Sequence, residues 1–100
     1  MLPFPSSIVI KTLQLADDLP HPITSNDIPF YTCNFHVYTH PVKYGPSGIQ
    51  EGIIYPNDIM WLRNANLRDF RFKNLNAGDN GLIVAEMTVP NAFVKKELGV

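Results

Sequence analysis

Hydrophobic and polar residues alternate along several short stretches of the chain, and this alternation predicts β-strands. Residues 30–39 show it most clearly, because every second residue from position 31 to position 37 is apolar. Side chains at every second position of a strand share one face of the sheet, and the side chains between them share the other. We therefore expect Cys33, Phe35 and Val37 to lie in the core.

A second β-rich run covers residues 82–89 and ends the alternating part of the chain. Its alternation places Ile83 and Met87 on one face, and we expect both to pack in the core with the apolar face of residues 30–39. Shorter runs bounded by Asn, Asp, Gly and Pro indicate further strands. The predicted strands cover residues 7–15, 30–39, 49–55, 59–62, 70–72 and 82–89.

In the first of these strands, Ile8 and Ile10 share one face and Val9 lies on the other. Two long segments between strands are predicted to be connections. Residues 16–27 are mostly polar, with two prolines and two adjacent aspartates, and residues 40–48 contain two glycines and two prolines. Both compositions are typical of loops.

The stretch from residue 58 to residue 73 has two interpretations. In the favoured one, residues 59–62 are a short buried strand that includes Trp61, residues 64–66 interrupt it, and residues 70–72 are a separate strand. Residues 70–72 would then pair with the last strand as antiparallel neighbours across a loop. The alternative makes residues 58–73 a helix, against which its two asparagines and its alternating phenylalanines argue.

The two ends of the chain differ from the middle. Residues 1–6 contain two prolines, which prevent regular strand pairing, and are predicted to form an extended arm. Residues 92–98 follow a potential Asn cap and precede a glycine, so a short helix is predicted there. We expect both segments to make contacts with other subunits. Their apolar residues, the candidate interface, are Leu2, Phe4, Phe93, Val94 and Leu98.

Taken together, these elements predict an all-β fold, which is a small antiparallel β-sandwich or a jelly-roll-like barrel with a short C-terminal helix. A chain of 100 residues corresponds to one domain, here residues 7–100 preceded by the arm. The formal net charge is −1, and this near-neutral balance does not favour nucleic acid or an anionic membrane as a partner. No basic region precedes the apolar residues at the N-terminus, so a secretory signal peptide is not expected.

Residues with chemical potential are few. His36 and His40 would lie about 13 Å apart on a strand, too far to share one metal ion at the bond lengths typical of zinc. Cys33 could in principle be a nucleophile with His36 as its base, but the alternation places the two side chains on opposite faces. We therefore expect neither an enzyme nor a cofactor. Aromatic side chains could instead form a sugar-stacking platform, for which the candidates are Tyr44, Tyr55 and Trp61.

The order of these features resembles that of small β-sandwich structural proteins of tailed-phage virions, which are head decoration or tail-associated subunits. The resemblance covers residues 8–89. It rests on an opening strand SIVIKTLQL, a strand IPFYTCNFHVYT, a Gly-containing strand GIQEGIIY, a Pro-Asn-Asp turn, and the segment NLRDFRFKNLNAGDNGLIV.

The resemblance implies a non-enzymatic virion protein, made in the host cytoplasm, that acts through subunit–subunit contacts. Its partners would be further copies of itself and other virion proteins, with no nucleic acid and no membrane involved. The alternative from the residues alone is a lectin-like β-sandwich module that binds carbohydrate.

Overall fold

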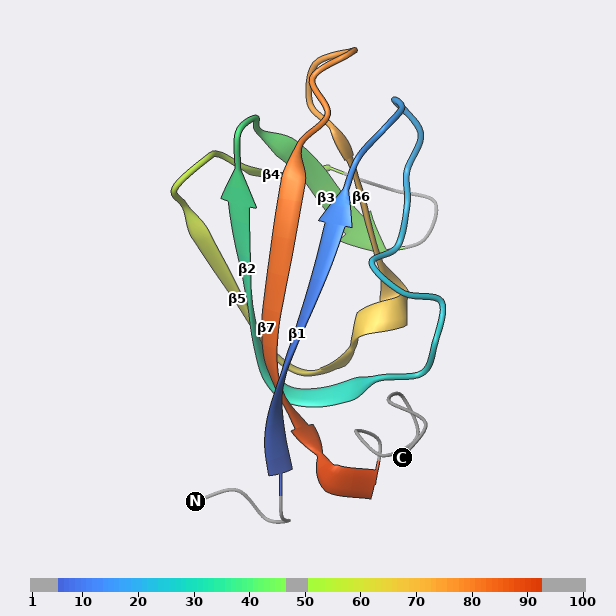
Figure 1. Ribbon diagram of the computed structural model, residues 1–100, viewed down its shortest axis with the longest axis vertical. Coiled ribbons are helices and arrows are strands. Elements are labelled where there is room, and N and C mark those ends of the chain that lie inside the picture. Colours follow the sequence, from blue (N-terminus) through green and yellow to red (C-terminus); the bar gives the residue numbers. More distant parts are fainter. Residues whose placement is uncertain (1–5, 47–50, 93–100) are drawn as a thin grey trace.

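The computed structural model describes residues 6–46 and 51–92, and this part of the chain is all-β, as predicted (Figure 1). In chain order, the described elements are β1 (Ser6–Gln14), β2 (Pro29–Tyr38), β3 (Val42–Pro46), β4 (Gly52–Ile54), β5 (Ile59–Asn66), the 3-10 helix η1 (Leu67–Asp69), β6 (Phe70–Asn74) and β7 (Leu82–Pro90).

The strands form two antiparallel sheets. One has four strands in the order β1-β7-β2-β5, and the other has three in the order β4-β3-β6. In Figure 1 the four-stranded sheet lies in front and the three-stranded sheet behind it. Strand β2 is central in the larger sheet, where Cys33 pairs with Met87 of β7 on one side and with Leu62 of β5 on the other. Residues that pair in this way share a face of the sheet.

The core lies between the two sheets and is centred on three phenylalanines. The ring of Phe35 in β2 lies 5.2 Å from that of Phe72 and 6.2 Å from that of Phe70, both in β6. Tilted contacts at these distances are favourable for aromatic rings. The core prediction is confirmed, because the five side chains expected there are all buried: Cys33, Phe35, Val37, Ile83 and Met87.

The predicted pairing of residues 70–72 with the last strand is wrong. Strand β6 pairs with β3 in the smaller sheet, whereas both edges of β7 are occupied, by β1 and by β2. The partner of β6 was missed because residues 40–48 were predicted to be a loop. The alternation of apolar residues in this segment is short, with only Val42 and Tyr44 facing the core. Gly45 and Pro46, which are typical of loops, follow directly in the sequence.

Two further expectations about residues 58–73 are corrected. Strand β5 continues through the predicted break, although Asn64 has a positive φ of 51°, a conformation that asparagine tolerates better than most residues. The helical alternative is also wrong, since the segment consists of β5, the single turn η1 and the start of β6.

The predicted arm and C-terminal helix fall almost entirely outside the described residues. Ser6, the last residue of the predicted arm, already belongs to β1. The expected interface residues therefore stay predictions: Leu2, Phe4, Phe93, Val94 and Leu98.

A buried asparagine joins three segments at one end of the sheets. Asn74, at the end of β6, is 3% exposed, and its Oδ1 accepts a hydrogen bond of 2.8 Å from the N–H of Gly81, just before β7. Its Nδ2 donates to the carbonyl of Asp17 at 3.1 Å and lies 3.3 Å from Oδ1 of Asp18, both in the connection after β1. Asp18 Oδ1 also accepts from the N–H of Gly78 at 2.8 Å.

Replacement of Asn74 by alanine is expected to lower the free energy of unfolding by about 1–3 kcal/mol, because the buried N–H of Gly81 would lose its acceptor. Urea denaturation of the two proteins measures this difference. Asn76→Ala is the matched control, since Asn76 is exposed and its contact with Asp79 is long at 3.5 Å. Equal stability of the Asn74 variant and the wild type would contradict the assigned role.

Candidate functional site

The four-stranded sheet buries one face against the smaller sheet and leaves the other in contact with solvent. Cys33, Phe35 and Val37 point to the buried side, so the residues of β2 that alternate with them point to the other side. The residues of the neighbouring strands that pair with these alternate residues point to that other side too. This second side is named the outer face. It consists of Ile8, Ile10, Thr12 and Gln14 of β1; Leu82, Val84, Glu86 and Thr88 of β7; Thr32, Asn34, His36 and Tyr38 of β2; and Ile59, Trp61 and Arg63 of β5.

Both margins of the outer face carry large apolar side chains in water. On β1, Ile8 is 69% exposed and Ile10 is 60% exposed, and on β5, Trp61 is 62% exposed. Ile59 beside it is also exposed. Exposure of large apolar side chains to water is unfavourable, and here it is concentrated at the two margins of one face.

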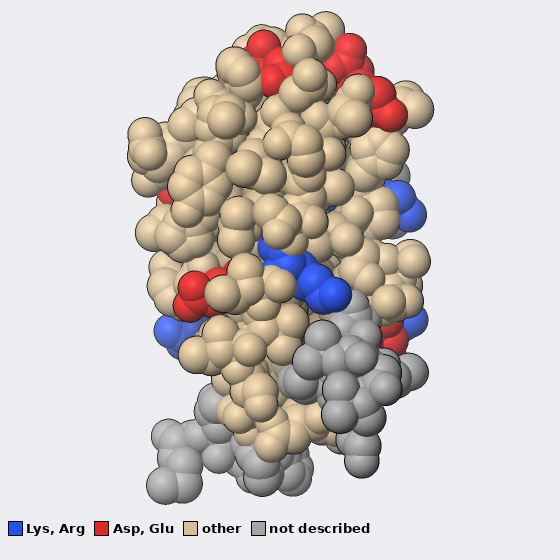
Figure 2. Space-filling model, viewed as in Figure 1, with Lys and Arg blue, Asp and Glu red and all other residues tan. Residues whose placement is uncertain are grey.

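The middle of the outer face is mostly polar. Thr32 Oγ1 donates to Thr88 Oγ1 at 3.3 Å, and Asn34 lies between Glu86 and Trp61 in register. Asn34 is 9% exposed, and its Oδ1 has no hydrogen-bond partner among the described residues. Figure 2 shows the side of the molecule on which the four-stranded sheet lies, with acidic groups gathered at its upper end and a basic group near its middle.

The expected burial of Trp61 is wrong, and the register gives the reason. Leu62 pairs with Cys33 and packs on the core, so its neighbour Trp61 must point to the other side. The apolar run at positions 59–62 therefore supplies both faces: Met60 and Leu62 pack inward, and Ile59 and Trp61 point outward.

The structure does not gather the three candidate sugar-stacking rings at one pocket. Tyr44 packs against the core, over Gly52 of the adjacent strand, where a side chain would collide with the tyrosine ring. A hollow of about 290 Å³ beside Tyr44 is lined by neither Tyr55 nor Trp61. Tyr55 is exposed after β4, and Trp61 lies on the outer face of the other sheet.

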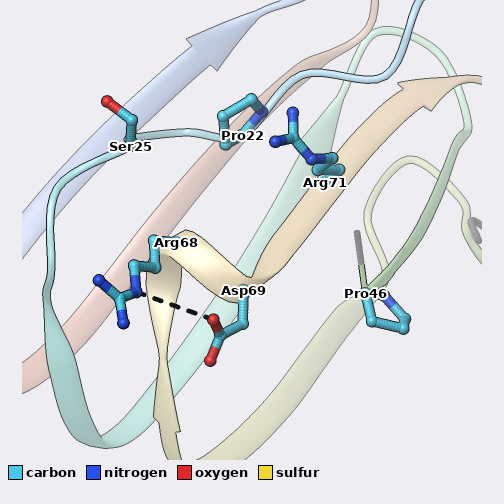
Figure 3. A pocket seen from close by; sticks show the side chains of 6 residues that line it. All are labelled: Pro22, Ser25, Pro46, Arg68, Asp69 and Arg71. Carbon is cyan, nitrogen blue, oxygen red and sulfur yellow. Dashed lines mark ion pairs between the residues drawn. The ribbon is translucent and has the colours of Figure 1, made fainter. Parts of the chain in front are cut away.

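A larger hollow, of about 550 Å³, is open and lacks a convergent set of reactive groups (Figure 3). Arg68 and Asp69 form an exposed ion pair at 3.9 Å. The side chain of Arg71 extends towards Pro22, in a different direction from that of Arg68. The remaining lining residues are Ser25 and Pro46.

The groups considered for catalysis are held apart. Burial, with a smaller contribution from the charge of Glu86, raises the pKa of the Cys33 thiol to about 12, so the thiolate is scarce near neutral pH. His36 lies on the opposite face and stacks on Tyr38, with ring centres 6.2 Å apart. A hydrogen bond of 2.7 Å with His21 and a second from the Leu19 N–H lower the pKa of the exposed Asp17.

Metal ligands do not cluster in the described part of the chain, where no three His, Cys, Asp or Glu side chains are placed to hold an ion. His40 Nδ1 lies 3.8 Å from Asp79 Oδ2, whereas the ring of His36 stacks on Tyr38. Among residues 6–46 and 51–92 there is also no helix with the length and apolar character needed to cross a membrane.

Comparison with known proteins gives no relative: no family model, no curated protein and no solved structure matches the chain.

Cys33 is expected to resist a thiol-specific reagent in the folded protein, because the side chain is 1% exposed and its pKa is raised to about 12. In denaturant the same thiol should react at once, which provides the control. The rate of reagent consumption at mildly alkaline pH measures the effect. Rapid reaction of the native protein would show that the Cys33 face of β2 is accessible and that the core assignment is wrong.

Proposed function

We propose that the protein is a non-enzymatic structural subunit of a tailed-phage virion, as a capsid decoration or tail-associated protein, and that it acts through subunit contacts made by the outer face. The observation that carries the proposal is the exposure of Ile8, Ile10 and Trp61 on one sheet surface. We further propose that the two packed sheets form a β-sandwich, the architecture that the resemblance to virion proteins implies.

Burial of the outer face supplies a driving force for assembly. A large apolar side chain gains roughly 1.5–3 kcal/mol when it moves from water into a fully buried position. Trp and Tyr are also enriched at protein interfaces, where they combine a large contact area with a polar group. Trp61 and Tyr38 on the outer face have this character.

The use of polar side chains supports a structural role. Asn74 and Asp18 fix loops by accepting hydrogen bonds from backbone N–H groups. Asn66 does the same, because its Oδ1 accepts from the N–H groups of Ile28 at 3.1 Å and Arg68 at 3.3 Å. Asn66 Nδ2 donates in turn to Asp27. These side chains stabilise the chain's own turns through hydrogen bonds to backbone groups.

Carbohydrate binding is the second candidate, favoured by one observation. Trp61 presents an exposed indole ring, the group on which sugars stack, and the polar Asn34 lies beside it in register. This function predicts binding to a glycan array that Trp61→Ala abolishes while the protein stays folded.

Incorporation into phage particles tests the proposed function. In a density gradient of particles from cells that express the chain, the wild type is expected to sediment with the particles. Trp61→Glu should remain largely at the top, because a carboxylate would have to be buried at the contact. The matched control is Ile53→Glu, an exposed isoleucine of β4 in the other sheet, which should sediment as the wild type does.

Absence of the wild-type chain from the particles would overturn the virion role. Binding of the same protein to glycans, lost on Trp61→Ala, would then assign it to the carbohydrate-binding class.

A further inference from the structure

We propose that the outer face binds the outer face of a second copy of this chain, with a two-fold axis parallel to the strands. The inference rests on the proposed function as a structural subunit and names the partner and the geometry of the contact. It follows from the positions of apolar, polar and charged residues in the register of the four strands.

Two sheets that pack face to face keep their strands within about 30° of each other. A two-fold axis parallel to the strands then places β1 of one copy opposite β5 of the other, and β7 opposite β2. The rows of the register stay aligned in this arrangement. Ile10, Glu86, Asn34 and Trp61 form one such row, and Ile8, Thr88, Thr32 and Arg63 form the next.

Under this operation, each row of one copy lies opposite the same row of the other copy. Ile10 of one copy lies opposite Trp61 of the other, so these two exposed apolar side chains cover each other. Thr88 lies opposite Thr32, and Leu82 opposite Tyr38. With the Glu86–Asn34 pair, four of the seven opposed pairs match in character. The other three are mixed, because Ile8 lies opposite Arg63, Thr12 opposite Ile59 and Val84 opposite His36.

The charges also suit a second copy. Glu86 lies opposite Asn34, whose amide Nδ2 is a donor for a carboxylate. Arg63 lies opposite Ile8, and the stem of an arginine covers apolar surface while its guanidinium stays in water. One arginine and one glutamate leave the outer face without net formal charge when histidine is neutral, so two copies meet without long-range repulsion.

A two-fold axis perpendicular to the strands gives a poorer match. The rows would then be inverted, so that Ile10 would lie opposite Thr12 and Glu86 opposite Val84. The carboxylate of Glu86 would meet an aliphatic group, and the exposed Ile10 would gain little apolar cover. The parallel axis is therefore the arrangement that the residues favour.

The area of the outer face predicts a weak, reversible dimer. Four strands about 4.8 Å apart and eight residues long at about 3.3 Å each cover roughly 500 Å² per copy, or roughly 1,000 Å² for two. Stable complexes bury about 1,200–2,000 Å², and smaller interfaces are typically weak and transient. We expect a dissociation constant in the micromolar range.

The first measurement uses Trp61, the single tryptophan, as a reporter. With increasing concentration of the full chain, its emission should shift to the blue as the indole leaves water, in parallel with dimer formation in sedimentation velocity. Ile10→Lys and Trp61→Glu should each weaken dimerisation by more than about tenfold. Ile53→Lys, on the other sheet, should dimerise as the wild type does.

The decisive experiment mixes the two weakened variants. If residue 10 lies opposite residue 61, the mixed dimer has one native Ile–Trp contact and one Lys–Glu pair, so mixing Ile10→Lys with Trp61→Glu should restore association. Circular dichroism of each variant verifies that it is folded. No restoration on mixing, with both variants folded, would overturn the proposed geometry, and a monomeric wild type would overturn the dimer itself.

The outcomes separate this inference from the proposed function. A wild-type chain that is monomeric in solution but present in phage particles would refute the dimer and leave the virion role standing. A chain that dimerises and shows the restoration on mixing, but is absent from particles, would refute the virion role and leave the dimer standing.

Discussion

The contact between Phe35 and Phe72 across the two sheets is the interaction on which the rest of the structure depends. Both rings are fully buried, and they lie 5.2 Å apart between strands that belong to different sheets. The contact decides which side of β2 points inward. Because β2 is central, with β7 and β5 on either side, its orientation is passed through the register to every strand of the larger sheet. A shift of one residue would exchange the two faces completely.

The composition of the outer face is a consequence of this constraint. Once Cys33 and Phe35 face the core, Leu62 must follow them inward and Trp61 must point to solvent. The same reasoning turns Val9 towards the core and leaves Ile8 and Ile10 in water. The apolar residues exposed on the outer face are therefore set by the same register that forms the core.

Loops and sheets contribute differently to the molecule. Loops are held in place by hydrogen bonds from buried or partly buried amide side chains. At one end of the sheets, Asn74 bonds to the backbone of Gly81 and of the connection after β1. Asn66 makes comparable bonds at the start of η1. These polar groups are thus engaged in hydrogen bonds to backbone groups, whereas the outer face of the larger sheet leaves apolar side chains in water.

The sequence by itself determined the all-β class and the inward face of the two best strands, because alternation in residues 30–39 and 82–89 pairs an apolar face with a more polar one. It also placed Ile8 and Ile10 on a common face. Only the tertiary structure decided that this face, and the face of Trp61, would be exposed. Both faces of those two strands carry apolar residues, so the local pattern does not indicate which face is buried. It likewise decided that β6 pairs with β3 and not with β7. Strand pairing depends on contacts between residues far apart in the chain, and β3 itself has too short an alternation to be distinguished from a loop by its sequence.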